Sequence, residues 1–78
     1  MTEETDRTVD CIGLACPQPL LRTRVALGKM EAGEILEVLA DDPDAKKDIT
    51  GLVRRLDHTL LDFSEEDAIL RFLIRKND

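Results

Sequence analysis

Aromatic and cysteine side chains are scarce in this 78-residue chain, which has two phenylalanines, two cysteines, no tryptophan and no tyrosine. With so few aromatic rings, the chain lacks the platforms on which the bases of single-stranded nucleic acids stack. Acidic side chains outnumber basic ones by 17 to 11, and the net charge of −6 repels phosphate backbones and anionic membranes. No apolar run approaches the length of a membrane span. We therefore expect neither a direct nucleic acid ligand nor a membrane partner.

The chain is also short, which limits its organisation. At 78 residues it is near the lower limit for a self-sufficient core, so we expect one domain over residues 1–78, with 1–6 as a frayed leader. There is room for a sheet and two helices but not for an enclosed cofactor cavity, so no bound cofactor is expected. Residues 1–10 lack the basic and apolar regions of a secretory signal, which favours a cytoplasmic protein. Two cysteines in that compartment more often do chemistry or stay free than form a structural disulfide.

Hydrophobic periodicity predicts six elements in the order β-α-β-α-β-β. They are strands at 8–11, 35–40, 59–64 and 68–75, a helix at 17–31, and a helix that begins at Pro43 with Asp42 as its N-cap. The first two strands should be parallel with a right-handed crossover, and the last two should form a hairpin with an acidic turn at 65–67. The predicted fold class is an α/β (α+β) two-layer sandwich, with a mixed four-stranded sheet and both helices on one face.

The same patterns predict individual positions in these elements. Gly33 is expected to cap the C-terminus of the first helix. Gly51 costs the second helix about 1 kcal/mol relative to alanine, which predicts a close packing contact at that position. The side chains expected to face the core from the first helix and the last strand are Leu20, Thr23, Leu27, Met30, Leu70, Phe72 and Ile74.

The most informative segment is Cys16-Pro17-Gln18-Pro19. Proline is tolerated in the first turn of a helix, where N–H groups have no intrahelical partner, so the two prolines place Cys16 at or beside a helix N-cap. The positive end of the helix dipole lies there, which predicts that the pKa of Cys16 is below that of a free thiol. The thiolate form of cysteine is the form that attacks and accepts sulfur. An inert, packed cysteine would fit the same position.

The segment around this cysteine resembles the TusA/SirA family of small sulfur carriers. The resemblance rests on Asp10, the pair Gly13-Leu14 and the Cys-Pro-x-Pro box at 16–19. It extends over nearly the whole chain from Asp10 onward, through Gly33-Glu34, residues 40–43, Asp48-Ile49 and residues 73–76. The family has a two-layer fold with the same order of elements, in agreement with the order predicted from periodicity.

The resemblance implies that Cys16 accepts a sulfane sulfur as a covalent persulfide. Pro17 and Pro19 would shape its turn, and Gly13 and Asp10 would have structural roles, with Asp10 expected to cap a turn. The sulfur would come from a cysteine desulfurase or a rhodanese-type donor. It would pass to an acceptor protein in a relay such as tRNA thiolation or sulfur oxidation. A carrier of this kind needs both proteins, so independent enzymatic turnover stays open.

Basic residues often follow the box in this family, which makes Arg22 and Arg24 candidate docking residues for a partner. Val25 departs from that pattern, because a second adjacent basic residue is common there. The departure weakens the case for a shared cationic docking patch.

Alternative interpretations stay open at this stage. Cys11 could pair with Cys16 in a thiol–disulfide redox protein, although a buried strand cysteine is the simpler interpretation. In a third interpretation the chain is a non-catalytic regulatory module in which Cys16 only packs. His58 and two cysteines are too few ligands for a zinc site, and His58 fits a helix–strand junction better than a catalytic base. The acidic run 41–44 is explained by helix-start chemistry, with a partner-binding edge as the alternative.

Overall fold

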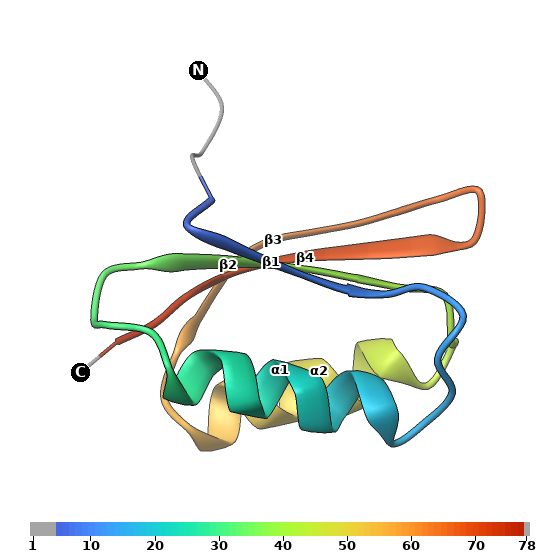
Figure 1. Ribbon diagram of the computed structural model, residues 1–78. Coiled ribbons are helices and arrows are strands. Elements are labelled where there is room, and N and C mark those ends of the chain that lie inside the picture. Colours follow the sequence, from blue (N-terminus) through green and yellow to red (C-terminus); the bar gives the residue numbers. More distant parts are fainter. Residues whose placement is uncertain (1–4, 78) are drawn as a thin grey trace.

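The computed structural model describes residues 5–77, which form two layers (Figure 1). The elements are β1 (Arg7–Cys11), α1 (Gln18–Gly28), β2 (Ile35–Ala40), α2 (Ala45–Arg55), β3 (Thr59–Glu66) and β4 (Ile69–Arg75). One layer is the sheet, and both helices cover the same face of it. The predicted fold class and element order are confirmed.

The four strands form one mixed sheet in the order β1-β2-β4-β3. β1 runs parallel to β2, as expected for a β-α-β unit, and Cys11 lies opposite Ala40 at the end of that pairing. β4 is antiparallel to both β2 and β3. β1 and β3 are therefore the two edge strands, and the loops after β1 and β2 meet at one end of the sheet (Figure 1).

The core lies between the sheet and the helices. Alternation in β4 turns Leu70, Phe72 and Ile74 toward the helices, and all three are buried as predicted. Thr23 is the one buried polar residue of the described chain, and its hydroxyl donates to the carbonyl of Pro19 at 2.7 Å. The other buried members of the core are Cys11, Ala26, Leu27, Met30, Leu36, Val38, Ala40, Ala45, Ile49, Leu52 and Val53.

The predicted helix boundaries need correction. α1 begins at Gln18 with Pro17 as its N-cap, and it ends at Gly28, three residues before the predicted end. Gly33 is not its C-cap, because Lys29 occupies that place and Gly33 lies in the turn before β2 with φ +93°. α2 begins at Ala45, two residues later than predicted.

The N-cap of α2 is Asp44, so the predicted cap at Asp42 is also wrong. Asp42 stabilises the preceding turn instead. Its carboxylate accepts the N–H of Asp44 at 3.0 Å, and its carbonyl accepts the N–H of Ala45 at 2.9 Å.

The hairpin between β3 and β4 is tighter than predicted. Its strands continue to Glu66 and resume at Ile69, so the turn is Asp67-Ala68 and not the acidic segment 65–67. Both turn residues have positive φ, 53° and 66°. Such a two-residue turn matches the twist of the flanking strands, but it usually carries Asn or Gly. Alanine gives no sequence signal for it, which explains the error.

The two ends of the described chain are attached to the sheet. The predicted leader, residues 1–6, falls largely outside the described residues, but Asp6 exchanges two hydrogen bonds with Ile35 at 2.8 Å. At the other end, His58 Nδ1 accepts the N–H of Asn77 at 3.0 Å, and burial lowers the pKa of His58. His58 lies between α2 and β3 as expected.

Within residues 5–77, neither helix has the length and apolar character needed to cross a membrane.

Gly51 has no packing reason to be glycine, contrary to the sequence prediction. It is exposed on α2, and a Cβ built there meets no other atom within 4 Å. Gly51→Ala should therefore stabilise the protein by about 0.5–1 kcal/mol, through the helix propensity of alanine. Chemical denaturation would measure the gain. Gly33→Ala is a matched control that should destabilise by about 1 kcal/mol, because its φ is positive. A loss of stability in Gly51→Ala would contradict the prediction.

Candidate functional site

Cys16 lies in the loop that joins β1 to α1, directly before the N-cap Pro17. The predicted place beside a helix N-cap is confirmed. Pro19 occupies the first turn of α1 and is buried, so the helix start is packed against the core. Cys16 itself is exposed and its thiol is free. A thiol in this place is available to another protein.

Gly13 lets the chain turn away from β1 toward Cys16. Its φ is +84°, which favours glycine, while a Cβ there would meet no atom within 4 Å. The turn is closed by the N–H of Leu14, which donates to the carbonyl of Cys11 at 3.1 Å. Asp10 caps the same turn, because its carboxylate accepts the N–H of Ile12 at 2.9 Å. The expected turn-capping role of Asp10 is therefore confirmed.

Two carboxylates that follow β2 bind the backbone of the loop between β1 and α1. Asp41 accepts the N–H of Gly13 at 3.0 Å, and Asp42 accepts the N–H of Cys16 at 2.5 Å. Bonds from backbone N–H groups to ionised carboxylates are stronger than neutral ones. The backbone that carries Cys16 is therefore held by residues 25 or more positions away in the sequence. The acidic run has a role that neither sequence interpretation foresaw.

A third carboxylate contacts the thiol itself. Asp48, on the first turn of α2, lies with Oδ2 3.2 Å from Cys16 Sγ, which donates its S–H to that oxygen. This hydrogen bond raises the pKa of Cys16, and partial desolvation and the negative charges of Asp48, Asp42 and Asp44 raise it further. The prediction of a lowered pKa is therefore wrong. The carboxylates close to the sulfur outweigh the partial charge of one helix end.

Sequence reasoning missed Asp48 because the contact joins two elements 32 residues apart. One signal was available, since Asp48 stands in the stretch that resembles the TusA/SirA family. An acidic residue in the first turn of a helix has a sufficient local explanation, because it complements the helix dipole. The local sequence therefore gives no sign that Asp48 contacts the thiol.

The other candidate residues lie apart from the thiol. Cys11 is fully buried at the end of β1, burial raises its pKa, and it forms no disulfide. Its prediction as a buried strand cysteine is confirmed. Arg22 and Arg24 are both exposed on α1, but only Arg22 lines the groove between α1 and β1. Among residues 5–77, no group of three His, Cys, Asp or Glu side chains converges as a metal ion would require.

Comparison with known proteins shows which proteins this chain resembles. Residues 7–76 match the family described as sulfurtransferase TusA. A protein of Archaeoglobus fulgidus named "Putative sulfur carrier protein" is 50% identical over 70 residues, covering 88% of this chain and 91% of the relative. A Bacillus subtilis protein named "Putative sulfur carrier protein YrkI" is 44% identical over 73 residues, covering 94% of this chain and 97% of the relative.

A solved structure has the same fold. The crystal structure of a SirA-like protein from Desulfitobacterium hafniense superimposes with a TM-score of 0.82, covering 92% of this chain and 99% of the other. The two sequences are 24% identical, so this likeness supports the arrangement of helices and strands alone.

Proposed function

This chain belongs to the TusA/SirA family of sulfur carriers, and we propose that it carries sulfur as a persulfide on Cys16. The observation that carries the proposal is the exposed Cys16 thiol, on a backbone that Asp42 holds through the Cys16 N–H at 2.5 Å. A carrier needs a nucleophile that another protein can reach. The exposed position of Cys16 supports this role.

The proposed chemistry is a transfer of sulfane sulfur between two cysteines. Cys16 attacks the terminal sulfur of a persulfide on the donor, a new S–S bond forms at Cys16, and the S–S bond of the donor breaks. The electron pair of that bond leaves on the donor sulfur, which takes up the proton that the Cys16 thiol has lost. No oxidant or reductant is consumed. In the second transfer, the thiol of the acceptor attacks the terminal sulfur of the Cys16 persulfide, and the S–S bond at Cys16 breaks.

The proposed partners are a cysteine desulfurase or a rhodanese-type protein as donor, and an acceptor protein in a cytoplasmic relay such as tRNA thiolation or sulfur oxidation. Because the donor loads the carrier and the acceptor unloads it, we propose no turnover by the carrier alone. Incubation with a cysteine desulfurase and cysteine, followed by intact-mass spectrometry, tests the proposal. The expected product is heavier by one sulfur atom and returns to the original mass with a thiol reductant. No adduct with any desulfurase or rhodanese would argue against it.

The thiol–disulfide alternative makes a different prediction about Cys11. A redox cycle between two cysteines needs both thiols, whereas sulfur carriage needs only the exposed one. Cys11 is fully buried in the core, so Cys11→Ala should leave sulfur loading intact and cost about 1 kcal/mol of stability through the lost contacts. Mass spectrometry and denaturant unfolding measure the two effects. A folded Cys11→Ala protein that fails to load would favour the redox interpretation.

A further inference from the structure

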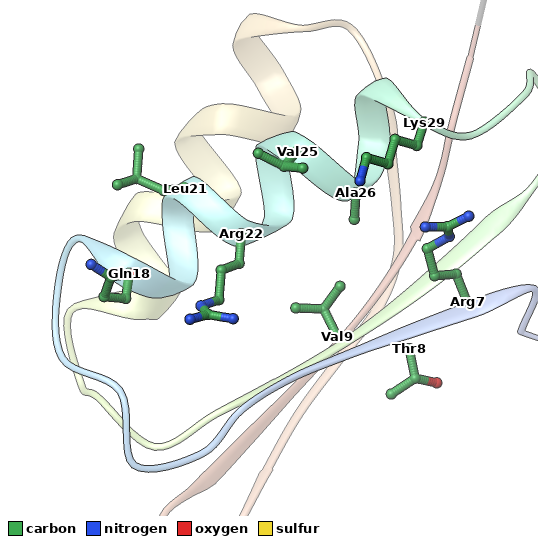
Figure 2. Close-up of a pocket in the computed structure, with 9 residues that line it drawn as sticks. All are labelled: Arg7, Thr8, Val9, Gln18, Leu21, Arg22, Val25, Ala26 and Lys29. Carbon is green, nitrogen blue, oxygen red and sulfur yellow. The ribbon is translucent and has the colours of Figure 1, made fainter.

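A groove of about 480 Å³ lies between α1 and the edge strand β1 (Figure 2). Leu21 and Val25 of α1, which are 45% and 57% exposed, line it, as does Val9 of β1, which points toward the helix in Figure 2. Large apolar side chains with this exposure on a helix next to an edge strand form a surface that a partner can cover. Gln18 lines the groove at the N-terminal end of α1, two residues after Cys16. The groove thus runs up to the loop of the proposed sulfur-carrying cysteine.

Within residues 5–77, the charged side chains that line the groove are Arg7 from β1 and Arg22 and Lys29 from α1, all of them basic. Figure 2 shows Arg22 reaching from α1 toward β1, and Arg7 reaching from β1 toward the helix. The single ion pair within residues 5–77 joins Arg71 to Glu37, outside this groove. Although the chain has a net charge of −6, these three basic side chains give the described part of the groove local complementarity to an anion.

The strand in this groove has a free edge. Within residues 5–77, β1 pairs with β2 on one side and with no strand on the other. A parallel strand directs about half of its backbone N–H and C=O groups to each side, so the outer groups of β1 are open to another extended chain. Addition of a peptide strand to such an edge gives affinity through the main chain, and nearby side chains give specificity.

We propose that this groove docks an extended, acidic segment of a protein partner as an added strand beside β1. Carboxylates of the segment would face Arg7, Arg22 and Lys29, and its apolar side chains would cover Leu21 and Val25. A small anion would fill only part of such an open surface, because small-molecule sites enclose most of their ligand. The inference rests on the proposed function for one point, that a partner seated here lies next to Cys16.

The test uses a short peptide in which valine alternates with glutamate, and a second peptide with lysine in place of glutamate. Backbone amide shifts are recorded by NMR on the whole protein. The glutamate peptide should shift the amides of β1 and of residues 18–29, and the lysine peptide should not. Arg7→Glu/Arg22→Glu/Lys29→Glu should bind the glutamate peptide at least about tenfold more weakly, since exposed charge pairs are individually weak but three of them are reversed. This variant should instead bind the lysine peptide.

Arg24→Glu is the matched control, because Arg24 is exposed on the same helix but does not line the groove. It should bind the glutamate peptide as the unmodified protein does. Shifts confined to other surfaces, or equal affinity of the triple variant and the unmodified protein, would overturn the inference. Loading of Cys16 from glutathione persulfide is measured in parallel on the unmodified protein. Failure of that loading in the unmodified protein would count against sulfur carriage and not against the groove.

Discussion

Cys16→Ser should abolish the sulfur adduct completely while the fold survives. A hydroxyl oxygen cannot take the place of the sulfur that holds the persulfide, and Cys11 is fully buried and out of reach of a protein donor. The exposed Cys16 side chain makes one hydrogen bond, to Asp48, which a serine hydroxyl can also donate. The expected mass after incubation with donor and cysteine is that of the unloaded chain, with an unfolding midpoint close to that of the unmodified protein.

Cys11→Ala is the matched control, because it removes the other thiol and should retain the adduct. An adduct that persists in Cys16→Ser would place the sulfur elsewhere and defeat the assignment of Cys16. A Cys16→Ser protein that fails to fold would show that the thiol is part of the packing. That outcome would favour the non-catalytic module.

The fold follows from the sequence because its elements carry strong, independent patterns. The near-continuous apolar run at 35–40, interrupted by Glu37, predicts an inner strand, and the structure places β2 between β1 and β4. Alternation at Leu70, Phe72 and Ile74 identifies the buried face of β4. The boundaries were harder to predict, because an Asp-Pro pair satisfies the sequence rules for a helix start at Asp42 and the chain instead forms one turn before Ala45.

The site could be predicted only in its local part. The Cys-Pro-x-Pro box identifies Cys16 and its place before a helix from adjacent residues alone. The electrostatics of the thiol depend on Asp48 and Asp42, which reach it only because the loops after β1 and β2 meet at one end of the sheet. A rule based on one helix end therefore gives the wrong sign for the pKa shift of Cys16.

The raised pKa has a consequence for a carrier protein. The raised pKa of Cys16 favours the neutral thiol over the thiolate, and a neutral thiol reacts poorly with oxidants and electrophiles. If Cys16 carries sulfur as proposed, a donor whose surface shields the thiol from these carboxylates would lower the pKa of Cys16 and favour the attacking thiolate.

Asp48→Asn should lower the pKa of Cys16 and so speed alkylation of the thiol at neutral pH. The Asp48 carboxylate accepts the S–H and adds a negative charge, and both effects favour the protonated thiol. An asparagine amide carries no charge and can donate a hydrogen bond to the thiolate. At a pH below the pKa of Cys16 in both the unmodified protein and the variant, each unit by which this pKa falls raises the thiolate fraction about tenfold. The measurement is the rate of iodoacetamide alkylation against pH, in a Cys11→Ala background where Cys16 is the sole thiol.

Asp44→Asn distinguishes the hydrogen bond from charge alone. It removes one negative charge as Asp48→Asn does, but Asp44 acts on Cys16 only through its charge and is the weakest of the named causes. Its alkylation profile should therefore move less toward low pH than that of Asp48→Asn. Equal displacements in the two variants would mean that net charge sets the pKa and that the contact of Asp48 with the sulfur has no special part. A profile of Asp48→Asn displaced toward high pH would refute the proposed effect of the carboxylate outright.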